Sequence, residues 1–371
     1  MKRLLVPLFA LGILLSACSP SDDGTGPIKI GFIGPLTGEA SPYGVDTLNG
    51  AKLAVDEINE AGGVNGRMIE IIAEDGRCTG TDAASAAQKL VNVDKVVAIV
   101  GGQCSGETLA AAPIAESAKV VMISPVSSSP DVTAAGDFIF RDYPSDGLKT
   151  KAMAGYLKKE GYGKVAAITE NTDFAIAFRD ALKENIGDAL MFDEVVEPGT
   201  KDYRSLMARL NDEEFDVFFP NGQSSATIGA MMQQLREQGL EQVAISHDVA
   251  QDKSLLEVAP EASVGLLAIG VPEVSADSDF GKKFLAGFGD TQAALLFAAQ
   301  SYDAVRIFAE AFAEVGTNGS AVRDYLYSVK DFDAIVGKIG FDDNGDVLGI
   351  PYVLWEATAD GFIQGEDVPV N

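Results

Sequence analysis

The sequence is poor in histidine and in basic residues. It contains one histidine, and its 28 lysines and arginines face 55 aspartates and glutamates, which gives a formal net charge of −27. A single histidine cannot build a histidine-based metal site, and we expect no bound metal. No lysine- or arginine-rich block is present, which argues against nucleic acid as a partner because phosphate backbones require a basic surface. Acidity of this size is typical of a solvated surface.

The short motifs of nucleotide and zinc sites are also missing. There is no P-loop, no GxGxxG and no CxxC pair, and we therefore predict no cofactor. Residues 342–346 (DDNGD) begin like a calcium loop, but Val347 and Val353 stand where the turn glycine and the bidentate glutamate belong. Asn344-Gly345 instead predicts a hairpin turn.

No apolar run near the N-terminus is long enough to span a membrane. Lys2 and Arg3 are followed by an apolar run over residues 4–15, and a spanning helix needs about 20 apolar residues. A basic start followed by a short apolar run is typical of a secretory signal. We expect residues 1–17 to be a signal peptide. Its removal leaves 26 of the 28 basic residues and all 55 acidic ones, so the formal net charge becomes −29.

The residues at the end of this run, LSAC at 15–18, resemble the bacterial lipobox. In that motif the cysteine, here Cys18, becomes the lipidated first residue of the mature chain. Residues 18–27 have the composition of a flexible tether, which would hold the folded part close to a membrane. The resemblance implies a membrane-anchored extracytoplasmic lipoprotein, in the periplasm or on the outer face of the cytoplasmic membrane. An ordinary cleaved signal with a cysteine by chance is the alternative.

With Cys18 assigned to the lipid, Cys78 and Cys104 remain as an even pair in an oxidising compartment. A disulfide between them would stabilise the fold by roughly 3 to 4 kcal/mol through the lost entropy of the unfolded chain. It would also fix the position of the segment that contains Ser105. Two free thiols are the alternative.

A free Cys104 would leave a remote alternative, a cysteine-dependent hydrolase. Residues 102–106 (GQCSG) follow a predicted strand and loosely fit a nucleophile elbow with cysteine at its centre. Asp173 and His247 follow in a permissible chain order as acid and base. A cysteine in a disulfide is no nucleophile, and we predict that the protein is not an enzyme.

Strand-like and helix-like stretches alternate along most of the chain, which predicts a parallel sheet with helices on both faces, an α/β fold. The predicted strands are residues 28–33, 68–73, 96–100, 120–123, 165–169, 217–219 and 243–246. The predicted helices include residues 45–61, a segment with Ile228, Met231, Met232 and Leu235 on one face, and residues 293–315 and 321–328. Residues 138–146 are rich in turn formers and mark a boundary between two lobes.

Small polar residues follow two of the predicted strands. They are GGQCS at 101–105 and PVSSS at 125–129. The carboxyl ends of parallel strands meet at one edge of a sheet, where ligands bind. Neutral hydroxyls and amides at such an edge can hold a carboxylate, aided by a helix N-terminus. Ordinary serine-capped turns are the alternative.

Several separate blocks carry a family resemblance, in the same order, over nearly the whole chain after residue 27. They are IKIGFIGPLTG at 28–38, Tyr43-Gly44, Gly50-Ala51, Ile58-Asn59, GGVNG at 62–66, Cys78, Cys104-Ser105, Ile123-Ser124-Pro125, Phe140-Arg141, Asp202-Tyr203, Gly265-Leu266-Leu267, Tyr302-Asp303-Ala304 and Phe341-Asp342. These blocks resemble the periplasmic leucine/isoleucine/valine-binding proteins, which serve branched-chain amino acid ABC transporters.

The resemblance implies a type I periplasmic-binding fold. In that fold two three-layer α/β/α lobes with mostly parallel sheets are joined by three crossovers, and a ligand is trapped by hinge closure. The first lobe would comprise residues 28–142 plus 273–350. The second lobe would comprise residues 143–268 plus 351–371.

The resemblance also assigns residues to the two charged groups of an amino acid. Ser105 and Ser128 would hold its carboxylate. Val126 would offer its carbonyl to the ammonium, with Ser127 between them. Asp248 would be the acidic partner of the ammonium, although relatives usually carry the longer glutamate there. A solvent-facing aspartate at a helix start is the alternative for Asp248.

Three further residues are assigned to the ligand side chain. Tyr43 and Phe174 would line the pocket, with core packing alone as their alternative. Gln223 lies in PNGQSS at 220–225, where relatives have another tyrosine, and this departure favours a more polar ligand than leucine. The lone His247 is interpreted as incidental.

Together with the anchor, the resemblance implies the solute-binding component of an ABC importer. It would capture a neutral amino acid, branched-chain or otherwise aliphatic, and deliver it to ABC permease subunits. We expect a monomer whose lobes close on the ligand. The alternative is a sensor subunit of the same fold that binds an amide or another small organic solute.

Overall fold

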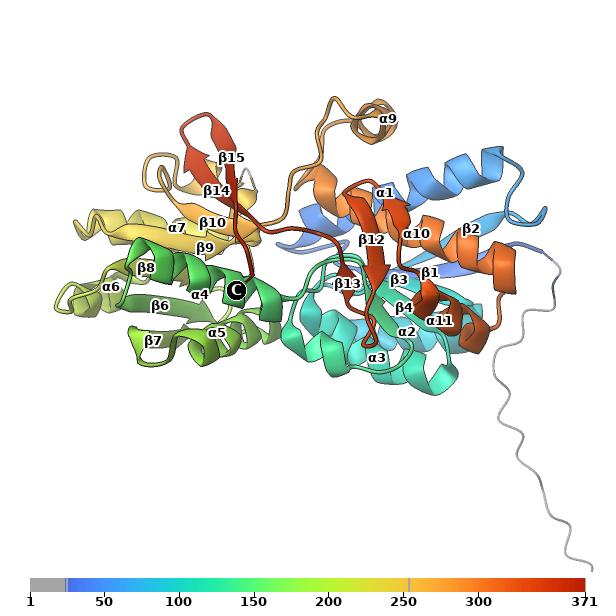
Figure 1. Cartoon of the computed structure of the whole chain (residues 1–371), viewed down its shortest axis with the longest axis horizontal. Helices are drawn as coiled ribbons and strands as arrows, with labels where there is room; N and C mark the ends of the chain where they lie inside the picture. Colours follow the sequence, from blue (N-terminus) through green and yellow to red (C-terminus); the bar gives the residue numbers. More distant parts are fainter. Residues whose placement is uncertain (1–23, 25, 253, 371) are drawn as a thin grey trace, which may run out of the picture.

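The computed structural model describes residues 24, 26–252 and 254–370. The signal peptide expected at 1–17, the lipidation site expected at Cys18 and most of the tether expected at 18–27 lie outside the described residues. Within the described part, no helix is long and apolar enough to cross a membrane. Figure 1 shows two lobes side by side, each with its own large sheet.

The first lobe contains a five-stranded parallel sheet with the order β2-β1-β3-β4-β5. Its strands are β1 (Ile28–Gly34), β2 (Ile69–Asp75), β3 (Ala98–Gly101), β4 (Val121–Ser124) and β5 (Ile139–Arg141). The central strands β3 and β4 are buried at every position. Continuous burial of this kind is expected where helices cover both faces of a sheet.

Four long helices cover the first sheet: α1 (Ser41–Glu60), α2 (Gly80–Lys89), α3 (Ser105–Ala118) and α10 (Leu295–Val315). Successive side chains of a strand point to opposite faces. Accordingly, Ile30 and Phe32 of β1 pack in one hydrophobic cluster with α1 and α10, whereas Ile33 packs with α2 and α3. Helix α10 therefore completes a layer that begins more than two hundred residues earlier in the chain.

The second lobe contains a seven-stranded sheet with the order β15-β14-β10-β9-β8-β6-β7. Its strands are β6 (Val165–Glu170), β7 (Leu190–Val196), β8 (Val217–Asn221), β9 (Val243–His247), β10 (Leu267–Gly270), β14 (Val353–Thr358) and β15 (Gly361–Asp367). β6 to β10 are parallel, and β14 and β15 add an antiparallel edge.

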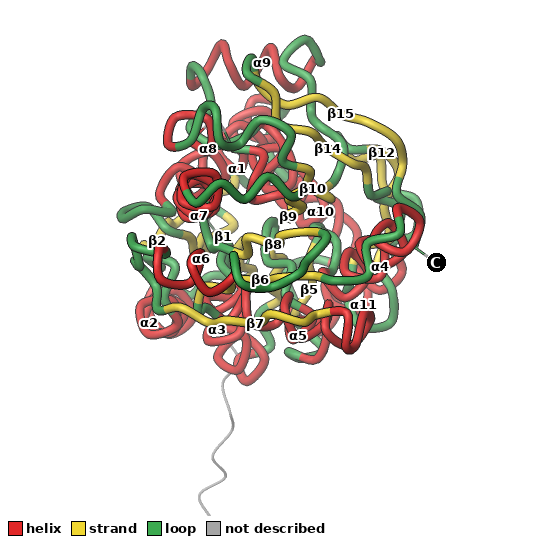
Figure 2. The backbone as a smooth tube through the Cα atoms, turned by 90° about the vertical axis from the view of Figure 1, so that its left-hand side faces the viewer, coloured by secondary structure: helices red, strands yellow, loops and turns green. Residues whose placement is uncertain are grey.

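Helices also lie on both faces of the second sheet. They are α4 (Asp146–Glu160), α5 (Asp173–Ile186), α6 (Arg204–Leu210), α7 (Ser225–Glu237) and α8 (Ser254–Val258). The predicted apolar face of α7 is confirmed, because Met231 and Leu235 are fully buried in one cluster with α6 and α8. Figure 2 views this lobe from its end and shows strands running between helices. The predicted two-lobe α/β class is confirmed.

The chain passes between the two sheets three times: after β5, after β10 and before β14. The remaining elements are α9 (Asp279–Phe288), α11 (Gly319–Ser328), β11 (Phe332–Ala334), β12 (Gly337–Phe341), β13 (Val347–Leu348), the short π-helix η1 (Leu90–Asp94) and the short 3₁₀-helices η2 (Pro130–Ala134), η3 (Gly187–Ala189) and η4 (Asp248–Gln251). β12 and β13 pair antiparallel, which confirms the hairpin predicted at Asn344-Gly345.

Among the differences from the expected elements, two have a local physical cause. Strand β7 was not predicted, because its sequence LMFDEVV is interrupted by Asp193 and Glu194. It is an edge strand with a half-exposed face, so it does not carry the continuous apolar run of its buried neighbours. Helix α1 begins at Ser41, four residues before the predicted start, with Pro42 in its first turn, where a missing amide hydrogen costs no hydrogen bond.

Candidate functional site

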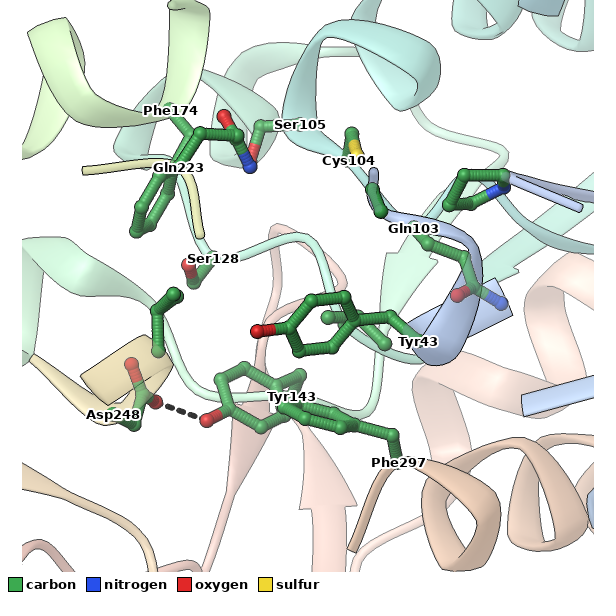
Figure 3. A pocket seen from close by; sticks show the side chains of 14 residues that line it. Tyr43, Gln103, Cys104, Ser105, Ser128, Tyr143, Phe174, Gln223, Asp248 and Phe297 are labelled. Carbon is green, nitrogen blue, oxygen red and sulfur yellow. Dashed lines mark hydrogen bonds between the residues drawn. The ribbon is translucent and has the colours of Figure 1, made fainter. Parts of the chain in front are cut away.

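A cavity lies between the two lobes at the carboxyl ends of both sheets (Figure 3). Fourteen residues line it. They are Pro35, Ala40, Tyr43, Gln103, Cys104, Ser105, Val126, Ser128, Tyr143, Phe174, Gln223, Asp248, Val249 and Phe297. Its empty volume, including the open solvent at its mouth, is about 540 Å³. The lining residues follow β1, β3, β4 and β5 of the first sheet and β6, β8 and β9 of the second, except Phe297, which lies in α10.

The structure brings together seven of the eight residues that the resemblance assigned to the ligand, and Ser127 is the exception. The Ser127 hydroxyl lies 3.1 Å from the carbonyl oxygens of Gly102 and Gln103 and 2.7 Å from the Thr108 hydroxyl. These bonds join the segments that follow β3 and β4. Ser127 is therefore a structural residue beside the cavity and is not part of its lining.

The segment after β3 is held by a buried carboxylate and a disulfide. Cys78 and Cys104 are bonded, with their Cα atoms 5.3 Å apart, as expected. The Glu107 carboxylate accepts hydrogen bonds from the backbone amides of Cys78, Gln103 and Cys104, at 2.8 to 3.1 Å. Burial raises the pKa of Glu107 to about 6, although these amides work in the opposite direction. The bonded Cys104 is not the free thiol that the hydrolase alternative requires.

We call Ser105 and Ser128 the hydroxyl end of the cavity. Ser105 is the first residue of α3, so it lies at the positive end of the helix dipole. Its hydroxyl accepts a hydrogen bond from the Ser129 amide at 3.2 Å, which ties the two strand-end segments together. Both serines are buried and uncharged. Such an end can satisfy a carboxylate without a cationic side chain.

We call Asp248 and its partners the charged end. The Tyr143 hydroxyl donates to Asp248 Oδ2 (Figure 3). Lys149 Nζ lies 2.7 Å from the same oxygen. Lys149 Nζ also lies 2.9 Å from Asp146 Oδ1. The Asp248 residue is only 6% exposed, so the alternative of a solvent-facing aspartate is wrong. The charged end is a buried ionic cluster.

The pKa values at the charged end follow from burial and from these contacts. Burial alone would raise the pKa of Asp248, but the Lys149 ammonium outweighs it and the pKa lies below its usual range. Burial alone would lower the pKa of Lys149, yet its two carboxylate partners raise it. Asp146 keeps a raised pKa because burial exceeds the stabilising effect of Lys149. Lys149 therefore stays charged and holds Asp248 in its ionised form.

The sequence interpretation missed Tyr143, Asp146 and Lys149. Asp146 and Lys149 are three residues apart at the start of α4, on one face of the helix. That spacing was a visible signal of an ion pair. Their contact with Asp248 was not visible, because about one hundred residues separate Lys149 from Asp248 in the chain.

Aromatic side chains form the wall between the two ends. The rings of Tyr43 and Phe297 meet edge to face, with centroids 5.4 Å apart, and Tyr143 lies 6.2 Å from Phe297. Phe174 packs edge to face against His247 with centroids 5.0 Å apart. This wall is suited to an apolar ligand group.

His247 is a packing residue in the described structure. It is fully buried, and its Nε2 lies 3.1 Å from Asn221 Oδ1. Burial lowers its pKa to about 3, with an opposing effect from Asp248. It is therefore neutral near pH 7. Gln223 lines the cavity, and its backbone amide donates to Glu170 at 2.8 Å, while the neighbouring Ser224 caps α7.

Among the described residues, no group of histidine, cysteine, aspartate or glutamate side chains is arranged to hold a metal ion. The polar side chains that line the cavity carry hydroxyls, two amides (Gln103 and Gln223) and one ion-paired carboxylate. This set can bind a small solute by hydrogen bonds and charge.

The chain was compared with protein families, with characterised proteins and with solved structures. Residues 27–361 match a family described as periplasmic binding protein. An amino acid binding protein of Pseudomonas aeruginosa is 30% identical over 94% of this chain and 96% of its own length. The Leu/Ile/Val-binding protein of Escherichia coli K12 is 27% identical over 90% and 92%. The solved structure of the branched-chain amino acid transporter substrate binding protein LivJ from Streptococcus pneumoniae, in complex with isoleucine, is 26% identical, with a TM-score of 0.81 over 91% of this chain and all of that one.

Proposed function

Because the chain belongs to the periplasmic binding protein family, we propose that it is the extracytoplasmic solute-binding component of an ABC importer. Its cargo would be a neutral amino acid with a branched-chain or other aliphatic side chain. The names of its relatives and the isoleucine in the pneumococcal structure support this ligand class. The partners would be the amino acid, the permease subunits and, through a lipid on Cys18, a membrane. The binding protein itself would act as a monomer.

The observation that carries the proposal is the division of the cavity into two unlike polar ends with an aromatic wall between them. A zwitterion that leaves water must recover hydrogen bonds at both charged groups or lose several kcal/mol. In our proposal Ser105 and Ser128 take the carboxylate. Asp248 and the Val126 carbonyl take the ammonium.

The aromatic wall and one polar residue complete the proposed binding mode. Tyr43 and Phe174 contact the ligand side chain, and Gln223 lies beside it. Because these groups come from both lobes, a bound ligand interacts better with the closed arrangement than with an open one, and this difference drives closure. The hinge is formed by the three connections between residues 28–142 plus 273–350 and residues 143–268 plus 351–371.

A ligand screen tests the proposal. Purified mature chain is heated with each of a panel of amino acids, amides and small organic acids, and calorimetry follows on the compounds that raise the unfolding temperature. A true ligand at about 100 times its Kd should stabilise the protein by about 2.7 kcal/mol. Leucine, isoleucine or valine should give the largest shift. A shift with an amide or an organic acid, and with no amino acid, would contradict the proposal.

The proposed anchor has its own test. Cells producing the full chain are labelled with a fatty acid, and the wild type is compared with Cys18→Ala. The wild type should carry the label and sediment with membranes. The variant should lose both properties. A wild-type chain without label would show that residues 1–17 are an ordinary cleaved signal.

A further inference from the structure

The charged end contains an ammonium group of its own. Lys149 Nζ lies 2.7 Å from Asp248 and 2.9 Å from Asp146, and the side chains of all three residues are at most 5% exposed. Both bonds to Asp248 use Oδ2, one from Lys149 and one from Tyr143. Figure 3 shows the other oxygen of Asp248 directed away from the Tyr143 hydroxyl, and Asp248 lines the cavity. The carboxylate that faces the ligand is thus already partly neutralised.

The other titratable groups near this cluster do not change its charge. Burial raises the pKa values of the Tyr143 and Tyr352 hydroxyls, and nearby carboxylates add to that effect. His247 is neutral near pH 7 because burial lowers its pKa to about 3. With both aspartates ionised, which the contact of each carboxylate with Lys149 Nζ favours, two negative charges and one positive charge remain. The cluster then carries one net negative charge in a buried site.

We propose that the charge triad, formed by Asp146, Lys149 and Asp248, sets the charge that the cavity offers to its ligand. The triad matches a ligand with one ammonium group beside its carboxylate. This inference rests on the proposed function and deepens it. Asp248 lines the cavity, whereas Asp146 and Lys149 do not, so the latter two are positioning residues that act through Asp248.

Asp146 supplies the charge that makes the match. Without it, Lys149 and Asp248 would form a neutral pair. A ligand ammonium would then meet a carboxylate whose charge the Lys149 ammonium already compensates. The cost of removing the ligand ammonium from water would not be offset. With Asp146 ionised, the ligand ammonium completes a neutral set of two positive and two negative charges. Charges in a site of low dielectric interact strongly enough for this difference to govern affinity.

The experiment measures two probes by calorimetry on the mature chain. They are leucine and 4-methylpentanoate, which keeps the carboxylate and the side chain of leucine and lacks its ammonium. Asp146→Asn should weaken leucine binding by about tenfold or more and change 4-methylpentanoate binding by less than about threefold. The double variant Asp146→Asn, Lys149→Met leaves Asp248 as the single charge. It should restore leucine affinity to within about threefold of the wild type.

Asp142→Asn is the matched control. Asp142 is a fully buried carboxylate four residues before Asp146, and it does not line the cavity. Burial and the nearby Asp303 raise its pKa well above the usual range, so asparagine resembles its uncharged form. This variant should leave the ratio of the two affinities unchanged. If Asp146→Asn does not fold, Asp146→Ser replaces it with the same expectation.

The outcomes separate this inference from the proposed function. If the wild type binds leucine but Asp146→Asn weakens both probes equally, the role of Asp146 is structural and the triad proposal is overturned. Failure of the double variant to recover leucine binding, with an intact fold by circular dichroism, also overturns it. If the wild type binds no neutral amino acid, the proposed function fails, and the triad proposal fails with it.

Discussion

The hydroxyl end of the cavity, at Ser105 and Ser128, is built from neutral groups that the backbone, a disulfide and Glu107 hold in place. The charged end, at Asp248, is built from buried ions that hold one another. Losing one neutral hydrogen bond costs about 1 kcal/mol, whereas breaking one side of a buried ion pair costs about 3 to 5 kcal/mol because a charge is left behind. The two ends should therefore respond very differently to substitution.

The largest effect is expected from Asp248→Ala. This change removes a buried carboxylate and leaves the Lys149 ammonium with Asp146 as its remaining partner. We expect leucine affinity to fall at least about a hundredfold, because the ligand ammonium loses its carboxylate partner. The free energy of unfolding should fall by less than the about 3 to 5 kcal/mol of an unpaired buried charge, because Asp146 still pairs with Lys149. Calorimetry and urea unfolding measure the two quantities. The exposed Asp212→Ala is the control. If Asp248→Ala weakened leucine binding no more than Asp212→Ala, Asp248 would not be the partner of the ammonium.

The next effect concerns the support of the hydroxyl end. Replacing Cys78 and Cys104 with serine removes the disulfide, and we expect the free energy of unfolding to fall by about 3 to 4 kcal/mol. Leucine should also bind more weakly, because Cys104 and Ser105 both line the cavity. Urea unfolding with and without a reducing agent makes the measurement. Reducing agent should destabilise the wild type and have no effect on the double variant.

Glu107 gives the hydroxyl end a pH dependence. Its pKa is raised to about 6 in the folded chain, so between about pH 4.3 and 6 the folded state binds more protons than the unfolded state. Stability contributed by this group is present below that window and is lost as the pH rises through it, by about 2 kcal/mol. Glu107→Gln should not show this loss. The unfolding free energy of the wild type minus that of the variant should fall by that amount between pH 4 and pH 7. A difference that stays constant with pH would contradict the expectation.

The smallest effect distinguishes Ser105, which is proposed to bind the ligand, from Ser127, which joins two segments of the first lobe. Ser105→Ala should weaken leucine and 4-methylpentanoate together by about tenfold, because both probes carry the carboxylate that the hydroxyl end is proposed to bind. Ser127→Ala should lower stability by about 1 kcal/mol, since its hydroxyl joins the segments after β3 and β4. If Ser127→Ala weakened binding more than Ser105→Ala, the assignment of the two serines would be reversed.

Much of the fold could be predicted because its signals are local. Buried strands such as β3 and β4 carry continuous apolar runs, and α7 carries an apolar stripe at helical spacing. Strand β7 was missed because an edge strand alternates polar and apolar residues only loosely. The division of each lobe into separate stretches of sequence came from the family resemblance and not from any local pattern.

The sequence predicted several residues of the candidate site but not the contacts between them. The resemblance named Ser105, Ser128 and Asp248, and all three line the cavity. It could not show that the Ser127 hydroxyl forms hydrogen bonds that join the segments after β3 and β4. It also did not show that Asp248 meets Lys149, because no spacing rule links residues so far apart in the chain.

The sequence by itself determined most of the element types and the family, and it favoured the pairing of the two cysteines, because these follow from periodicity, composition and ordered motifs. Only the tertiary structure decided which charges share a site. Residues of α4 and of the segment after β9 become neighbours because β6, β8, β9 and β10 are parallel and end at one edge. Burial at that edge then fixes their ionisation, since a charge removed from water needs a partner within a few ångströms.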